Sequence, residues 1–328
     1  MAEAAAARTS VASAPRAAGS AHRGFWVTRS AAAPRIARAY FAAQAIAGAL
    51  WWVGVFTLPW LRRATLGELD PVAVALWDVP LFVIASGIAA AGRRWAMRIA
   101  VPWTLLVTAG LAGYATATGL AGWGALLMAA ASCGSLVAWS LAVFGRIPAE
   151  TVLRGPLASR TARVGSRARH LATTLLQMLG FWVLFLGVLP LGIRLLEVRW
   201  GLHVGFPAWL QGLGWVVLLL ASALGVTAAA AMSLHGDGTP LPSATAVRLV
   251  IAGPYRWVRN PMALSGIAQA AGVGLLSSSW LVLGYAVCGG VYWNELVRPS
   301  EEAELEQRFG EEFTAYRDRV RCWAPRFG

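Results

Sequence analysis

The stretch Gly253-Pro254-Tyr255-Arg256-Trp257-Val258-Arg259-Asn260-Pro261 lies between long apolar runs, and its two prolines constrain the backbone. The first proline fixes its own φ, and the second disfavours a helical conformation at the residue before it. We therefore expect a short, rigid loop at the mouth of a helical hairpin. Guanidinium groups in such a loop suit a carboxylate or phosphate, and aromatic rings suit stacking or cation–π contact. The alternative is that Arg256 and Arg259 only anchor the chain at a membrane interface.

The composition indicates a membrane protein. Hydrophobic residues make up 58% of the 328 residues, with 17 tryptophans and a mean hydropathy of +0.59, against about 45–50% apolar residues in soluble chains. The basic residues are all arginine, and they give a net charge of +13. Because they lie between apolar runs, we expect them to meet membrane lipid headgroups and not nucleic acid. The 3 cysteines have no metal-ligand spacing, so no metal site is expected.

Apolar runs long enough to cross a bilayer predict an all-α polytopic membrane protein with about eight transmembrane helices and a C-terminal amphipathic cytoplasmic helix. These runs lie near residues 39–60, 73–92, 99–118, 123–145, 171–193, 207–232, 262–277 and 280–297. They divide the chain into a disordered cytoplasmic tail (1–38), a four-span membrane domain of unknown role (39–145), a cytoplasmic Arg-rich linker (146–169) and a second membrane domain (170–328).

The arginines also predict the orientation. If the N-terminus is cytoplasmic, every arginine lies inside except four, which are Arg62, Arg63, Arg194 and Arg199. Positive charge accumulates on cytoplasmic loops. We therefore expect an integral protein of a bacterial inner membrane, with both termini and the 253–261 loop facing the cytoplasm.

The charged tail after the last apolar run predicts an amphipathic helix. Ser300 is a suitable N-cap, and Glu301 and Glu302 would then occupy the first turn, where the helix dipole favours acids. Apolar residues recur at helical spacing from 305 to 320, with a break expected at Gly310. We expect Trp323 to pin the end of the tail.

Residues 235–328, with GTPLP, GPYRWVRNPM, SEEAELEQRFGEEFTAYRDRV and a terminal WAPR, resemble the isoprenylcysteine carboxyl methyltransferase-like and phospholipid methyltransferase families. The resemblance implies a membrane enzyme that uses S-adenosylmethionine, with residues 170–328 as its core and a cytoplasmic cofactor site. It implies Arg259 and Glu302 as catalytic residues. The cofactor-binding residues it implies are Gly253, Tyr255, Arg256, Arg259, Asn260, Pro261, Glu301, Glu302 and Tyr316.

The chain departs from the family pattern at two positions. The family loop usually reads Arg-His-Pro with a tyrosine two residues later, whereas this chain has Asn260 and Ala263. Asparagine cannot act as a base near pH 7, so a histidine role does not carry over. The methyl acceptor therefore stays open. An isoprenoid or fatty carboxylate, an amine-headgroup phospholipid and a prenylated cysteine are all lipophilic substrates that would enter from the bilayer.

Two other functions remain open. The membrane sterol reductases, which use NADPH, resemble the same core. A transporter or scaffold built on the first four spans would depend on Asp78, because an ionisable residue within a span marks a functional site by default. The alternative for Asp78 is a structural acid, either paired with a basic residue or placed near the interface.

Overall fold

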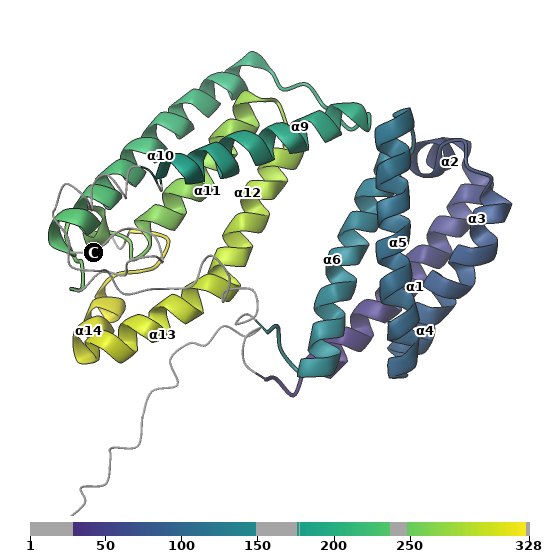
Figure 1. Cartoon of the computed structure of the whole chain (residues 1–328), viewed down its shortest axis with the longest axis horizontal. Coiled ribbons are helices and arrows are strands. Elements are labelled where there is room, and N and C mark those ends of the chain that lie inside the picture. The colour runs from purple at the N-terminus through teal and green to yellow at the C-terminus, as the bar shows by residue number, and fades with distance from the viewer. Residues whose placement is uncertain (1–28, 149–175, 177, 237–247, 326–328) are drawn as a thin grey trace, which may run out of the picture.

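The computed structural model describes residues 29–148, 176, 178–236 and 248–325. Every regular element in these ranges is a helix, and the helices form two lobes that meet at one end (Figure 1). Most of the expected N-terminal tail and most of the expected linker lie outside the described residues. Within these ranges six helices are long and apolar enough to cross a membrane, whereas about eight spans were expected, because the last two expected spans form shorter helices. The chain is therefore an all-helical integral membrane protein, as predicted.

The N-terminal lobe contains the first four spans. Its elements are α1 (Ala33–Thr57), α2 (Pro59–Leu66), α3 (Pro71–Asp78), η1 (Val79–Ile84), α4 (Ala85–Ala90), α5 (Arg94–Thr118) and α6 (Gly122–Phe144). The first span begins at Ala33 instead of near residue 39, so part of the expected tail is helical. The short helix α2 was not expected. The second span, α3–η1–α4, contains a π-helical turn at Pro80, which cannot donate a backbone hydrogen bond.

The C-terminal lobe contains the remaining spans and the tail. One span runs from Met178 to Arg199 and includes η2 (Trp182–Val188) and α9 (Leu189–Arg199). The other elements are α10 (Ala208–His235), η4 (Gly253–Arg256), α11 (Pro261–Leu276), α12 (Trp280–Tyr292), η5 (Trp293–Val297), α13 (Arg298–Phe309) and α14 (Glu311–Arg319). The expected hairpin of two short helices is α11 and α12, joined at Ser277–Ser279.

Close contact between α10 and α11 fixes the position of the 253–261 loop. A Cβ on Gly214 would lie 2.9 Å from the backbone nitrogen of Leu276, so the two backbones approach closely. Ser265 donates a hydrogen bond of 2.7 Å to the carbonyl oxygen of Ala221. Small residues and interhelical hydrogen bonds are the usual means of helix association in membranes. Because the loop leads directly into α11, this contact also holds the loop.

The lobes meet at the end opposite the tail helices (Figure 1). Trp200 packs against a cluster of buried residues at the ends of α5 and α6, and its indole donates a hydrogen bond of 3.0 Å to Thr116. The ring of Trp123 stacks on Trp280 with centroids 5.9 Å apart. Arg199 donates to the carbonyl oxygen of Thr116 at the same contact.

The tail differs from the expectation at its start. Helix α12 continues through η5 into α13 without interruption, so Ser300 lies inside a helix and is not an N-cap. The π-helical turn η5 precedes Pro299, whose missing N–H would otherwise break the helical hydrogen-bond pattern. The predicted break at Gly310 is confirmed, because this residue separates α13 from α14 with φ +53°.

Candidate active site

The 253–261 loop begins with a single 3₁₀ turn. Gly253 has φ +58°, a conformation that residues with a Cβ rarely adopt. The ring of Tyr255 is buried in a cluster with Ala228, Ala231 and Val250. Burial raises the pKa of the Tyr255 hydroxyl above its usual value. In this structure the Tyr255 ring therefore contributes to packing against α10, and its expected contact with a cofactor stays a prediction.

The loop and the end of the tail are joined by backbone hydrogen bonds. The Arg259 N–H donates to the carbonyl oxygen of Arg321 at 3.0 Å, and the Asn260 N–H donates to that of Cys322 at 3.4 Å. The hydroxyl of Tyr316, itself buried, donates to the carbonyl oxygen of Tyr255 at 2.7 Å. The 253–261 loop and the charged tail, which are the two sequence motifs, therefore form one structural unit.

Arg259 lies at the centre of this unit. Its Nη1 donates to the carbonyl oxygens of Arg317 and Val320 at 2.8 and 3.1 Å, at the C-terminal end of α14. Its Nη2 forms an ion pair of 2.9 Å with Glu302, which also lies 3.9 Å from Arg298. Arg259 Nε is buried and has no partner among the described residues. Most of the guanidinium group thus stabilises the tail, and the N–H of Nε remains free as a buried donor.

Glu301 faces the loop from α13. Its Oε2 lies 3.5 Å from Asn260 Nδ2, and no cation pairs with it in the described part of the chain. Burial, with smaller contributions from the neighbouring Glu304 and Glu302, raises the pKa of Glu301 to about 7, and the hydrogen bond from Asn260 opposes this rise. Asn260 also caps α11, because its Oδ1 accepts a hydrogen bond from Ala263 N–H at 3.1 Å.

The remaining predicted residues lie around this unit. Arg256 is exposed, and Pro261 is buried as the first residue of α11. The structure thus brings Arg259, Asn260, Glu301 and Glu302 together, while Gly253 and Tyr255 support the loop from the α10 side.

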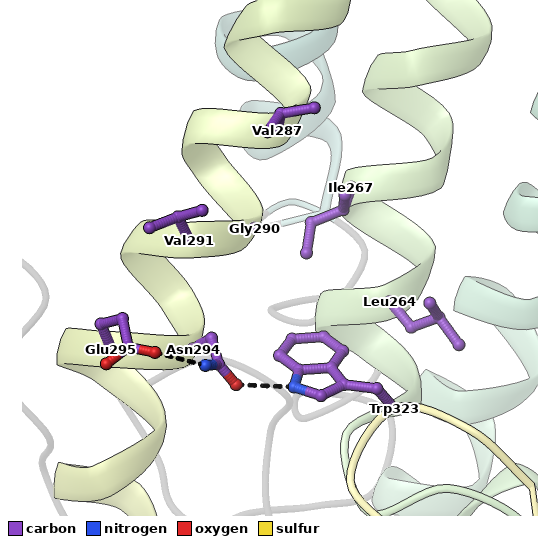
Figure 2. A pocket seen from close by; sticks show the side chains of 8 residues that line it. All are labelled: Leu264, Ile267, Val287, Gly290, Val291, Asn294, Glu295 and Trp323. Atoms are coloured by element: carbon purple, nitrogen blue, oxygen red, sulfur yellow. Dashed lines mark hydrogen bonds between the residues drawn. The ribbon is translucent and has the colours of Figure 1, made fainter. Parts of the chain in front are cut away.

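A groove of about 420 Å³ lies between α11 and α12, next to this unit (Figure 2). Its walls are apolar, and they include Val287 and Val291, whose exposed fractions of 65% and 58% place them on the outer surface of the lobe. Its polar end holds Asn294 and Glu295. Trp323 reaches this end from the tail and donates a hydrogen bond of 2.7 Å to Asn294 Oδ1.

The groove adjoins the two motifs through shared elements. Leu264, on its wall, is one helical turn after Asn260, and Trp323 follows Cys322, whose carbonyl oxygen binds the Asn260 N–H. The polar residues Asn294 and Glu295 lie in the π-helical turn η5, and such turns are frequent at functional sites.

Sequence reasoning missed Asn294 and Glu295. Asn294 Nδ2 donates to Glu295 Oε1 at 2.7 Å, so the two form a polar pair at the end of the last span. The rule that singled out Asp78, an acid inside an apolar run, applies equally to Glu295.

Two other acids, Asp78 and Glu197, lie within the described helices that are long enough to cross a membrane. Asp78 has no basic partner among the described residues, contrary to one of the two alternatives for it, and instead accepts hydrogen bonds from two tryptophans. Glu197, fully buried, accepts a hydrogen bond from Ser279 and lies 3.8 Å from His203. Because Ser279 also caps α12, Glu197 holds the turn between α11 and α12.

The fold and the site define a polytopic, helical membrane protein with a lipid-facing groove beside a cluster of arginine and glutamate side chains. Residues 209–312 match the family model of phospholipid methyltransferases. The family resemblance expected from the C-terminal motifs is therefore confirmed over residues 209–312, which contain the 253–261 loop and the start of the charged tail.

A solved structure of the eukaryotic intramembrane Ras methyltransferase, isoprenylcysteine carboxyl methyltransferase, aligns with 15% sequence identity over 89% of this chain and 97% of that chain. Its TM-score is 0.30, which is too low to transfer the positions of individual residues. No match to a curated protein was found.

Proposed function

We propose that the protein transfers a methyl group from S-adenosylmethionine to a lipophilic acceptor that enters the groove from the bilayer. The observation that carries the proposal is the position of the groove, whose apolar walls open on the outer surface of the lobe and whose polar end adjoins the two motifs. In this proposal both termini and the site face the cytoplasm of a bacterial inner membrane, consistent with the distribution of arginines.

The residues present fit the cofactor. Glu301 is a carboxylate without a cationic partner in the described ranges, which suits the ammonium group of the cofactor. The buried donors Arg259 Nε and Trp293 Nε1 have no partners there, which suits its carboxylate or hydroxyl groups. The groove volume lies within the range of about 300–1,000 Å³ usual for small-molecule sites.

When bound, the cofactor supplies an electrophilic methyl group on a cationic sulfur. The protein's task is then mainly to position the two reactants and exclude water. Glu301 would hold the ammonium group, and Arg256 and the free donor of Arg259 would hold the carboxylate. Glu302 lies between Arg259 and Arg298, so its contacts favour orienting Arg259, and its direct catalytic role stays a prediction.

The acceptor would lie with its apolar body between α11 and α12 and its head group near Glu295. Val287 and Val291 leave this wall open to lipid. A carboxylate acceptor needs no base. An amine or hydroxyl acceptor would lose a proton, and Glu295, at the polar end of the groove, is the carboxylate placed to accept it.

The test is thermal stabilisation of the detergent-solubilised protein by S-adenosylmethionine, S-adenosylhomocysteine and NADPH in separate experiments. A ligand at about 100 times its dissociation constant adds roughly 2.7 kcal/mol of stability. We expect stabilisation by the two methionine-derived ligands, weakened at least tenfold in affinity by Glu301→Gln. Glu311→Gln, which removes the same charge at an exposed position of α14, should bind as the parent does.

Methyl transfer is measured in parallel with labelled S-adenosylmethionine and a total lipid extract. Incorporation into a lipid fraction that depends on the protein supports the proposal. Stabilisation by NADPH alone would instead favour a reductase. Absence of both stabilisation and transfer with the methionine-derived ligands would overturn the proposal.

A further inference from the structure

The N-terminal lobe contains a second and larger cavity, of about 880 Å³. Its lining residues all lie between positions 40 and 131, so it is separate from the methyltransferase groove. Tyr40, Trp51, Trp77, Phe82 and Trp103 contribute aromatic rings to its wall. Nothing in the proposed methyl transfer uses this cavity.

Asp78 lines the cavity and is only 5% exposed. Its Oδ2 accepts a hydrogen bond of 2.9 Å from the Trp52 indole, and its Oδ1 accepts one of 2.9 Å from the Trp103 indole. An indole N–H is only a donor, so both carboxylate oxygens act as acceptors. Two acceptor positions remain for a further donor, because a carboxylate has about four lone-pair sites. Val74 and Trp77, which precede Asp78 on the same helix, also line the cavity. This helix crosses the membrane, where a carboxylate without a cationic partner costs free energy.

The other buried polar side chains described in this lobe all have hydrogen-bond partners, either backbone carbonyl oxygens or one another. Gln44 donates to Ser86 at 3.0 Å and accepts from Ser135 at 2.9 Å. Thr108 and Ser132 share a hydrogen bond of 2.7 Å. Among the residues that line the cavity, the only ionisable acids are Asp78 and Asp70, and there is no arginine or histidine. In a chain with a net charge of +13, this cavity is locally acidic.

The cavity also opens toward lipid. Trp77 and Leu127 line it and are 62% and 51% exposed. Aromatic faces around a carboxylate attract cations through the ring quadrupole as well as through charge. The apolar remainder of the wall favours a ligand with an apolar body.

We propose that the cavity of the N-terminal lobe binds a hydrophobic organic cation, an ammonium or quaternary ammonium compound, with its charge at Asp78 and its apolar body among the aromatic rings. The proposal does not depend on the methyl transfer proposed for the C-terminal lobe. It also gives the first four spans a role that the family match, which begins at residue 209, does not cover.

The test uses the full-length protein in nanodiscs of zwitterionic lipid, with radiolabelled tetraphenylphosphonium as the hydrophobic cation and empty nanodiscs as the background. We expect saturable binding by the parent at one site per chain. Asp78→Asn, which keeps the shape of the side chain and removes its charge, should weaken binding at least tenfold. The control Glu311→Gln removes an equal charge far from the cavity and should bind as the parent does.

A second variant tests the cavity without changing Asp78. Gly110 lines the cavity, and a Cβ added there meets no atom within 4 Å. Gly110→Phe should therefore fill the space and weaken binding at least tenfold, with no loss of thermal stability. If Asp78→Asn fails to fold, cation binding by Gly110→Phe tests the proposed site in its place.

Competition identifies the ligand class. Dodecyltrimethylammonium should displace the probe, whereas dodecyl maltoside, with the same chain and no charge, should not. Equal displacement by both would show a site for lipid chains and overturn the proposal. The proposal also fails if the parent shows no saturable binding, or if the folded variants bind as tightly as the parent does.

Discussion

Arg259 donates hydrogen bonds to two carbonyl oxygens at the end of α14 and to the carboxylate of Glu302, so it holds the tail against the loop. A side chain with these contacts affects ligand binding indirectly as well as directly. Loss of activity in an Arg259 variant would therefore not by itself show contact with the cofactor.

Arg259→Ala should lower the stability of the tail by roughly 2–4 kcal/mol. It removes three hydrogen bonds made by a charged group and leaves Glu302 partly buried with only the more distant Arg298. Arg256→Ala, three residues earlier and exposed, should change stability by less than about 0.5 kcal/mol. Thermal unfolding of both variants in detergent checks the prediction, and equal effects would contradict it.

The raised pKa of Glu301 predicts that the stability of the protein depends on pH. Its folded-state pKa of about 7 lies above the ordinary glutamate pKa of 4.5, so the folded protein binds more protons between these pH values. Stability attributable to this group therefore falls as pH rises from about 4.5 to 7, and the loss is complete above 7. Glu301→Gln should be more stable than the parent at pH 8, by roughly 2 kcal/mol after allowance for partial exposure.

The same comparison at pH 5 should show a much smaller difference, because Glu301 is then largely protonated in the folded protein. Thermal unfolding without ligand at the two pH values measures the effect. A constant difference between parent and variant at both pH values would mean that Glu301 does not titrate in this range.

At the scale of elements, the continuous helix from α12 through η5 to α13 sets the geometry of the site. The π-helical turn directs Asn294 and Glu295 to the end of the groove, and the unbroken helix carries Glu301 and Glu302 to the loop. The apolar pattern predicts both halves of this helix. It does not predict their continuity, because Ser300 followed by two glutamates is also the pattern of a helix start.

Ser300→Ala should be neutral or stabilise the protein by up to about 0.5 kcal/mol, because an exposed residue inside a helix gains helix propensity from the change. If Ser300 were an N-cap, the same change would cost about 1 kcal/mol. The sign of the change in thermal stability therefore distinguishes a continuous helix from two separate ones.

At the scale of the molecule, the lobes meet through small residues and tryptophans at the end away from the tail. A Cβ on Gly122 would overlap the carbonyl oxygen of Trp200, so only glycine allows this approach. The four arginines expected on the outer side lie in α2 and in α9, and Arg194 and Arg199 contact Ser277 and Thr116 there.

Gly122→Ala should destabilise the protein by about 1–3 kcal/mol, because the added methyl group meets backbone atoms that cannot rotate away. Gly113→Ala is the matched control, since a Cβ there meets nothing within 4 Å, and it should be neutral or stabilising by up to about 1 kcal/mol. Thermal unfolding of the two variants measures the difference. Equal stability would mean that the lobes do not approach each other at Gly122.

The sequence by itself determined the helical membrane class and the approximate spans, which follow from local patterns of apolar length, proline and glycine positions, and charge placement. The family resemblance, and no local pattern, implied that the 253–261 loop and the charged tail belong to one site. Only the tertiary structure decided how side chains are used. It shows Arg259 bound to backbone carbonyls, Tyr255 packed against α10, and Asp78 held by tryptophans in a cavity. Burial and hydrogen-bond partners come from residues distant in the sequence, so no local pattern specifies them.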